Sequence, residues 1–119
     1  DSSTSRGLGD VYKRQILTAR VGSIGDNNLG GWISYRTSKA AVHQIIRTSA
    51  LEIKNKFKES ICIALHPGTV KTNLTQKYVG NHPSVSPDQA AKNILNVINS
   101  LSQEDTGNFF DWAGKKVEW

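Results

Sequence analysis

The strongest constraint on the fold is a long amphipathic helical pattern that leads directly into a continuous apolar run. The pattern covers residues 34–57, and its mainly apolar positions recur at helical spacing: Val42, Ile45, Ile46, Ser49, Ala50, Ile53 and Phe57. The apolar run at residues 60–65 follows, and it stops at the breaker His66-Pro67-Gly68. Such a run is typical of a parallel strand that is buried on both faces. Together, the two segments predict a helix that packs on a sheet and leads into one of its central strands.

A second helix is predicted over residues 86–101 by its capping signals. Ser86 suits the N-cap, Pro87 suits the first helical position, and Gln89 stands where a capping box requires Glu or Gln. An apolar stripe continues to Leu101, and Thr106-Gly107 marks the end of the helical region.

Shorter extended segments complete the pattern. Residues 16–19 read as the remnant of a strand, residues 108–112 as a further strand, and residues 117–119 as a last extended piece. The stretches 22–31 and 69–85 have the composition of loops. Strand, helix, strand, helix, strand is the order of a parallel sheet with helical crossovers, so the predicted fold class is α/β.

Length and charge exclude several classes of protein. With 119 residues the chain can form one small domain, and its net charge of +5 comes without a basic cluster interleaved with aromatics, which argues against a nucleic-acid partner. No apolar run is long enough to span a membrane. The single cysteine, Cys62, excludes an internal disulfide and a cysteine-based zinc site, and we expect it to be buried. The absence of a signal pattern and of disulfides favours the cytoplasm.

The histidines do not form a metal site. His43, His66 and His82 share no metal-ligand spacing, so no metal is predicted. We expect His43 to lie on a helix surface or at an interface.

The first fifteen residues differ from the rest of the chain. They are rich in Ser, Arg and Gly without periodicity, and residues 5–15 read SRGLGDVYKRQ, which resembles the in-frame translation of a sequencing adapter. We therefore expect residues 1–15 to be non-native and disordered, and residues 16–119 to carry the fold. A natural disordered basic tail is the alternative.

Two residues near the start of the first helix can form an acid–base pair. Tyr35 and Lys39 are four positions apart and share one face of a helix. An ammonium beside a phenol favours loss of the phenol proton, and a nearby serine hydroxyl, such as that of Ser23, could hold a carbonyl oxygen while the phenol protonates it. This is the chemistry of carbonyl reduction, with a hydride supplied from elsewhere. The alternative is a chance pair on a solvated helix face.

Four features in the right order resemble the C-terminal half of a short-chain dehydrogenase/reductase, a Rossmann-like doubly wound parallel sheet. They are Ser23, Tyr35-x-x-x-Lys39, Pro67-Gly68-x-x-x-Thr72 and the capped helix at Ser86. The phrases ARVGSI and GGWISYRTSK are similar to the carbonyl-reductase branch with C-factor-like and sniffer-like proteins. The resemblance covers residues 16–119.

The resemblance implies roles for individual residues. Tyr35 corresponds to the general acid in reduction or the base in oxidation, and Lys39 to its partner, which also binds the nicotinamide ribose. The cofactor is NADP or NAD, with NADP favoured by the branch. Its nicotinamide end would be contacted by four further positions: Pro67, Gly68, Val70 and Thr72. Residues 73–85 correspond to the loop that selects the small-molecule carbonyl or alcohol substrate.

The serine is the departure from the family pattern. A catalytic serine usually stands three residues before the glycine that corresponds to Gly22, and that position here is Ala19, preceded by Thr18. We expect Ser23 to supply the hydroxyl, with Thr18 as the second candidate. The alternative for Ser23 is a loop serine with a local backbone hydrogen bond.

Parts of the family's site have no counterpart in the sequence. No Gly-x-Gly-x-x-Gly or Gly-x-x-x-Gly-x-Gly lies between a strand and a helix, and the catalytic asparagine and the residue that separates NAD from NADP have no counterpart either. We therefore expect a fragment of an NAD(P)-dependent oxidoreductase that is inactive by itself. The alternatives are a non-catalytic signalling or scaffold relative and an unrelated α/β binding domain. A homo-oligomer of the intact protein stays open.

Overall fold

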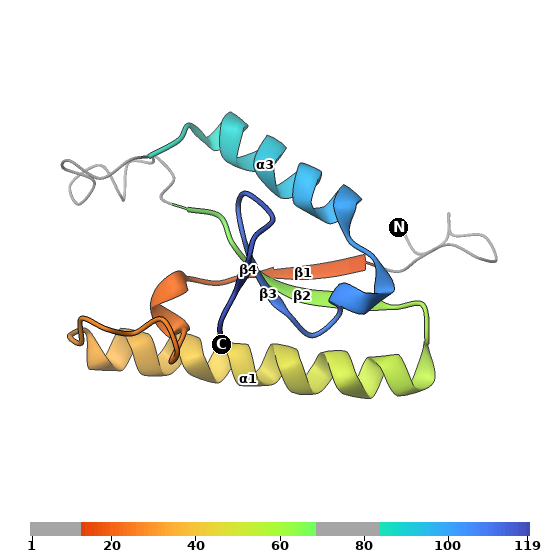
Figure 1. Ribbon diagram of the computed structural model, residues 1–119, viewed down its shortest axis with the longest axis horizontal. Coiled ribbons are helices and arrows are strands. Elements are labelled where there is room, and N and C mark those ends of the chain that lie inside the picture. The colour runs from red at the N-terminus through yellow and green to blue at the C-terminus, as the bar shows by residue number, and fades with distance from the viewer. Residues whose placement is uncertain (1–12, 69–83) are drawn as a thin grey trace.

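A computed structural model describes residues 13–68 and 84–119, which form a four-stranded sheet between two long helices (Figure 1). Its strands, in spatial order, are β1 (Lys13–Leu17), β2 (Ile61–His66), β3 (Phe109–Asp111) and β4 (Lys116–Val117). The pairs β1–β2 and β2–β3 are parallel, and β3–β4 is antiparallel. The predicted α/β class with a mainly parallel sheet is confirmed.

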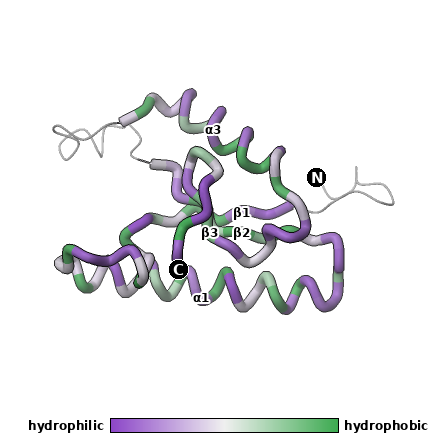
Figure 2. Tube along the Cα trace, in the orientation of Figure 1, coloured by the Kyte–Doolittle hydropathy of each residue, from purple (hydrophilic) through white to green (hydrophobic). Residues whose placement is uncertain are grey.

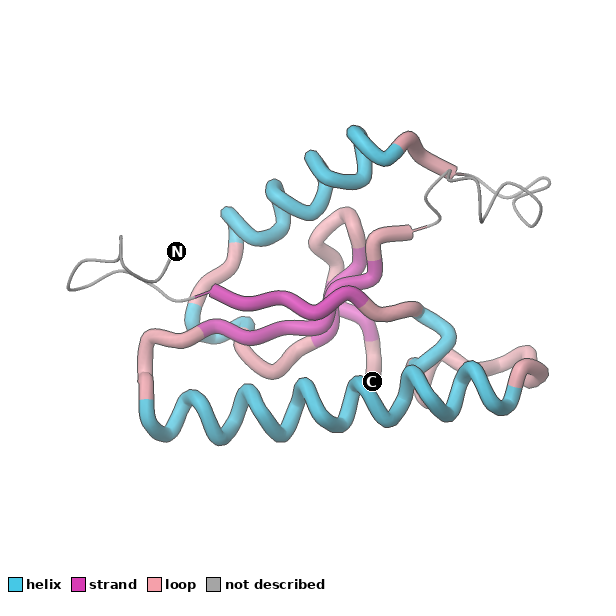
Figure 3. The backbone as a smooth tube through the Cα atoms, turned by 180° about the vertical axis from the view of Figure 1, so that it is seen from behind, coloured by secondary structure: helices cyan, strands magenta, loops and turns pink. Residues whose placement is uncertain are grey.

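The helices cover opposite faces of the sheet (Figure 3). Helix α1 (Ile33–Lys56) joins β1 to β2, and helix α3 (Pro87–Ser100) precedes β3. Short 3₁₀ turns, η1 (Arg20–Gly22) and η2 (Gln103–Asp105), follow β1 and α3. Apolar and polar stretches alternate along both helices in Figure 2, as expected of helices that bury one side only.

Strand β2 supplies the core on both faces, because successive side chains of a strand point to opposite sides. Cys62 and Ala64 pack with Ile46 and Ala50 of α1, together with Phe109. The alternate residues of β2 pack towards α3 in a second cluster: Ile61, Ile63, Leu65, Val97, Leu101 and Phe110. The predicted central strand and the predicted burial of Cys62 are both confirmed.

Strand β1 begins earlier than predicted, at Lys13 rather than at Ile16. Lys13, Arg14 and Gln15 pair in parallel register with Ile61, Cys62 and Ile63. The expectation that the whole of residues 1–15 is disordered is therefore wrong for the last three of them. Strand pairing uses the backbone, so an available edge of β2 can accept residues whose side chains give no strand signal. Residues 1–12 lie outside the described part of the chain.

The start of α1 also differs from the prediction, which placed the N-cap at Ser34. The N-cap is Trp32, whose backbone is left-handed with φ 53° and whose side chain does not cap the helix. The Arg36 side chain fixes this start, because its Nε donates to the Gly31 carbonyl at 2.8 Å and its Nη2 to the Gly30 carbonyl at 3.2 Å. The predicted cap of α3 is confirmed, since the Ser86 hydroxyl accepts from the Gln89 N–H at 3.2 Å.

Within the residues that the structure describes, no helix is long and apolar enough to cross a membrane.

Candidate functional site

The candidate site lies at the sheet edge where β1 and β2 both end. Ligands of open parallel sheets bind at the carboxyl ends of the strands, and here β1 leads into η1 while β2 leads into Pro67 and Gly68. The first turns of α1 lie beside the same edge (Figure 1). Three segments that are distant in the sequence therefore meet there.

Tyr35 and Lys39 are neighbours on α1, as their spacing predicts. The Lys39 Nζ lies 5.7 Å from the centre of the Tyr35 ring. Tyr35 is 47% exposed, so a small molecule can approach the residue from solvent. The structure brings this predicted pair together at an exposed end of the helix.

Gly22 allows η1 to approach α1 closely. A Cβ atom at Gly22 would lie 2.7 Å from the Lys39 Cβ, 2.7 Å from the His43 Cε1 and 2.9 Å from the Lys39 backbone carbon. Only a glycine fits against the helix backbone at such distances. The Gly22 position therefore sets how the loop after β1 lies against the Tyr35–Lys39 pair.

Replacing Gly22 with Ala should lower the free energy of unfolding by about 1–3 kcal/mol, because η1 must move away from α1 to make room for the methyl group. Urea unfolding followed by circular dichroism measures this change. Gly30→Asn is the matched control, because nothing lies within 4 Å of a Cβ at Gly30 and asparagine tolerates its φ of +71°. Equal effects of the two variants would contradict the proposed close contact.

Ser23 is held inside the fold. Its side chain is 1% exposed, its hydroxyl donates to the Glu118 carbonyl, and the hydroxyl oxygen accepts from the Asp26 N–H at 3.1 Å. To hold a substrate carbonyl, the Ser23 hydroxyl would have to donate its hydrogen bond to it, but this hydroxyl already donates to a backbone carbonyl. This arrangement corresponds to the structural alternative for Ser23, although its partner Glu118 is distant in the sequence.

Thr18 directly follows β1, and its side chain faces α1. Its N–H donates to the Leu65 carbonyl at 2.9 Å, and its Oγ1 lies 2.8 Å from the His43 Nε2. An imidazole nitrogen can either donate to or accept from this hydroxyl, depending on the tautomer. Thr18 can therefore accept from His43 and keep its own proton for another acceptor.

His43 is buried, so the expectation of a surface position is wrong. The side chain is 4% exposed, and its ring centre lies 4.6 Å from that of Phe109 and 5.1 Å from that of Trp119. His43 continues the helical spacing of Tyr35 and Lys39, which is the signal that could have placed it on the inner face. Its Nδ1 has no hydrogen-bond partner among the described residues.

Burial lowers the pKa of two histidines at this edge. For His43 the loss of solvent is the main cause, the nearby Lys39 charge lowers the pKa further, and the Gly22 carbonyl opposes both. For His66 burial again lowers the pKa most, the Arg20 charge adds to it, and Asp111 opposes it. Both imidazoles therefore favour the neutral form in the folded protein.

These shifts predict that stability falls as the pH drops below the ordinary histidine value of 6.5. The unfolded chain binds the protons first, so the free energy of unfolding declines by at most about 1.4 kcal/mol per pH unit for each histidine. The decline stops below the folded-state pKa values. Urea unfolding between pH 7.5 and 5.5 measures the slope, and His43→Gln should remove the part due to His43. A stability that rises over this interval would contradict the prediction.

The turn after β2 has a fixed geometry. The Gly68 N–H donates to the His66 Nδ1 at 3.3 Å, and Gly68 has a φ of +79°, which favours glycine. A Cβ there would lie 3.1 Å from the Trp112 Cδ1. Pro67 and Gly68 thus stand at the strand end as predicted, whereas Val70, Thr72 and most of the predicted substrate loop lie outside the described residues.

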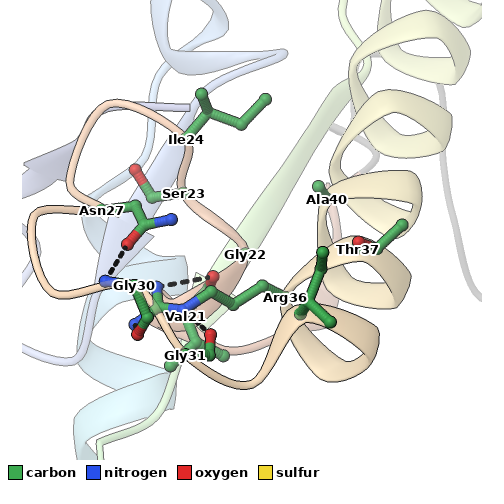
Figure 4. A pocket seen from close by; sticks show the side chains of 11 residues that line it. Val21, Gly22, Ser23, Ile24, Asn27, Gly30, Gly31, Arg36, Thr37 and Ala40 are labelled. Atoms are coloured by element: carbon green, nitrogen blue, oxygen red, sulfur yellow. Dashed lines mark hydrogen bonds between the residues drawn. The ribbon is translucent and has the colours of Figure 1, made fainter.

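A hollow of about 470 Å³ lies next to this site (Figure 4). It is formed by the loop after β1 and the side of the first turns of α1 that faces this loop, and its lining includes Ser23, Ile24, Ile33, Arg36 and Thr37. Tyr35 and Lys39 do not line it, because they lie on a different side of α1. The hollow is therefore separate from the acid–base pair.

Among the described residues, no group of three or more His, Cys, Asp or Glu side chains could hold a metal ion.

A scan against protein-family models found no match for the chain. Two curated proteins are similar in sequence. A 1-hydroxy-2-glutathionyl-2-methyl-3-butene dehydrogenase of Rhodococcus sp. (strain AD45) is 37% identical over 113 residues, covering 94% of this chain and 49% of that protein. The C-signal of Myxococcus xanthus is 32% identical over 103 residues, covering 87% of this chain and 58% of that protein.

Solved structures of oxidoreductases share the fold. NADPH-bound carbonyl reductase from chicken fatty liver has a TM-score of 0.73 and 32% identity, covering 90% of this chain and 42% of that chain. Carbonyl reductase Sniffer of Drosophila melanogaster has a TM-score of 0.76 and 26% identity, covering 90% of this chain and 41% of that chain. A short-chain dehydrogenase/reductase of Burkholderia multivorans with bound NADP has a TM-score of 0.69 and 27% identity, covering 90% of this chain and 44% of that chain.

The chain spans about half the length of the curated relatives that it matches, and less than half of the structural ones. The similarity covers nearly all of this chain and includes both its sequence and its sheet topology. The cofactors named with these structures are NADPH and NADP. The homologues of this chain are therefore short-chain dehydrogenase/reductase oxidoreductases, and the chain matches part of the carbonyl reductases among them.

Proposed function

We propose that this chain is the C-terminal part of an NADP(H)-dependent reductase that converts a small-molecule carbonyl to an alcohol, or the reverse. The observation that carries the proposal is the Tyr35–Lys39 pair, with the Lys39 Nζ 5.7 Å from an accessible Tyr35 ring at the carboxyl edge of the sheet. The family relationship supports the reaction class. The bound cofactor supplies the hydride, and the protein must supply the proton.

In this proposal Tyr35 gives its hydroxyl proton to the substrate oxygen as negative charge develops there. Lys39 stabilises the phenolate that remains, because its ammonium lies on the same side of α1. In the reverse direction the Tyr35 phenolate takes the alcohol proton. Both residues are held by the rigid helix α1, so the proton donor and its partner move together.

The hydroxyl that holds the substrate oxygen is better supplied by Thr18 than by Ser23. Such a hydroxyl must donate its proton to the substrate. The Ser23 proton is already donated to the Glu118 carbonyl, whereas the partner of Thr18 is an imidazole that can itself be the donor. With His43 donating from Nε2, the Thr18 proton is not used in that bond, although Thr18 is only 7% exposed and a substrate must reach it at the end of β1.

The described residues fit the nicotinamide end of NADP(H) and not its phosphate end. Tyr35 is accessible, Lys39 lies beside it, and both stand at the edge of the sheet where β2 ends in Pro67 and Gly68. The sequence has no glycine-rich turn between a strand and a helix for the pyrophosphate. We therefore propose that the intact protein contains a preceding cofactor-binding half and that residues 1–15 derive from an adapter. We also propose that the intact protein works in the cytoplasm as a monomer or homo-oligomer.

A second candidate function is non-catalytic signalling. The 32% identity to the C-signal of Myxococcus xanthus is the observation that favours it. In that case the fold is retained for binding, and the Tyr35–Lys39 pair has no catalytic use.

The proposal is tested by comparing two proteins. The first is the 119-residue chain, and the second is the full-length product encoded by overlapping reads that extend upstream of Ile16. We expect saturable NADPH binding and carbonyl reduction only for the longer protein, measured by NADPH fluorescence and by absorbance at the reduced-cofactor band. Upstream reads that return the same fifteen residues behind a start codon, or saturable micromolar NADPH binding to the short chain, would overturn the fragment proposal.

A further inference from the structure

We propose that the last three residues of the chain, which we call the tail (residues 117–119), position the part of the site that carries the Thr18 hydroxyl. The tail holds the loop after β1, and Trp119 fixes His43 and, through it, Thr18. Trp119 is thus a positioning residue. The proposal rests on the proposed function for the role of Thr18, but the contacts that carry it are independent of the reaction.

The first step is the attachment of the tail to the loop. The Ile24 N–H donates to the Trp119 carbonyl at 2.5 Å, and the Ser23 hydroxyl donates to the Glu118 carbonyl. The Glu118 side chain also occupies the space that a side chain at Gly25 would need. Three successive residues of the loop therefore contact two residues of the tail.

The tail is itself anchored in the sheet. Val117 belongs to β4, is 5% exposed and pairs with Phe109 of β3. The tail thus cannot shift without breaking strand pairing, so it provides a rigid support rather than a loose cover. The same Phe109 packs against α1 on the other side, which ties the tail to the core.

The second step is the contact of Trp119 with His43. The Trp119 ring centre lies 5.6 Å from that of Phe109, nearly parallel to it, and 5.1 Å from that of His43, edge to face. The indole thus limits where the imidazole can lie. Because the His43 Nε2 is 2.8 Å from the Thr18 Oγ1, a displaced imidazole takes the Thr18 hydrogen bond with it.

The indole also keeps solvent from the imidazole. The His43 Nδ1 has no hydrogen-bond partner among the described residues, and burial is the main reason for its lowered pKa. The other groups that act on this ring are the Gly22 carbonyl, Lys39 and the Thr18 hydroxyl. Removal of the Trp119 side chain should let water reach the imidazole. The His43 pKa therefore reports on the positioning contact.

The experiment is an NMR study of the 119-residue chain, in which His43 is titrated and amide exchange is measured. Trp119→Ala should raise the His43 pKa towards its ordinary value and should speed exchange of the Ile24 amide at least tenfold. Trp119→Phe should restore both, because a ring still packs against both Phe109 and His43. Trp112→Ala is the matched control, since Trp112 packs against Gly68, and it should change neither readout.

A second variant separates the two steps. Ser23→Ala removes the hydroxyl between Glu118 and the Asp26 N–H, so it should speed exchange of the Asp26 amide and leave the His43 pKa unchanged. If Trp119→Ala does not fold, Trp119→Leu gives the same comparison with Trp119→Phe. An unchanged His43 pKa in the Ala or Leu variant, or an equal change in Trp112→Ala, would overturn the proposal. Neither readout uses cofactor or turnover, so failure of this positioning proposal can be distinguished from failure of the proposed function.

Discussion

Tyr35→Phe is expected to lower the kcat of the full-length reductase by about 10²–10⁴-fold, while NADPH affinity stays nearly unchanged. A general acid contributes about this much, and the substitution removes only the phenol hydroxyl. The ring and its position 5.7 Å from the Lys39 ammonium are kept, so the local structure should be preserved. Steady-state kinetics with a carbonyl substrate and an NADPH binding titration measure the two effects separately.

The matched control for this variant is Ser34→Ala, which removes a hydroxyl from the neighbouring exposed position of α1. It should leave kcat within about twofold, because a surface substitution away from the chemistry has little effect. Retention of full turnover by Tyr35→Phe would exclude the proposed proton donor. Failure to find any turnover in the full-length wild-type protein would instead favour the signalling alternative.

Phe109→Ala is expected to lower the free energy of unfolding by about 3–5 kcal/mol. Phe109 is 0% exposed and lies in the cluster that joins α1 to β2. The centre of its ring also lies 4.6 Å from that of His43 and 5.6 Å from that of Trp119. Since a small domain is stabilised by only about 5–15 kcal/mol, one such cavity removes a large part of the total.

Phe57→Ala is the control for that prediction. Phe57 directly follows α1 and is 66% exposed, so its removal should cost less than about 1 kcal/mol. Urea midpoints followed by far-ultraviolet circular dichroism compare the two variants. Similar midpoints would show that Phe109 does not hold the helix to the sheet as described.

The order of helices and strands could be predicted from the sequence because the signals are local. The apolar run that became β2 and the Ser86 cap of α3 each depend on a few adjacent residues, and both were predicted correctly. The Tyr35–Lys39 neighbourhood follows from helical spacing alone. Such features need no knowledge of the rest of the fold.

The parts that could not be predicted depend on contacts between distant residues. Ser23 meets Glu118 through the fold, and Thr18 meets His43 across the space between β1 and α1. The start of α1 at Ile33 depends on Arg36, which binds carbonyls of the preceding loop. In each case the residue type alone allowed several partners, and only the packing of α1 against the sheet selects one.

The position of β1 has a practical consequence for work with this chain. Among the described strands β1 pairs with β2 alone, so the outer side of its backbone faces away from the sheet. An exposed strand edge can pair with the same edge of another copy. Protein concentration therefore becomes a variable in every measurement on the 119-residue chain, and dilution series by light scattering should accompany the unfolding and titration experiments so that they describe monomers.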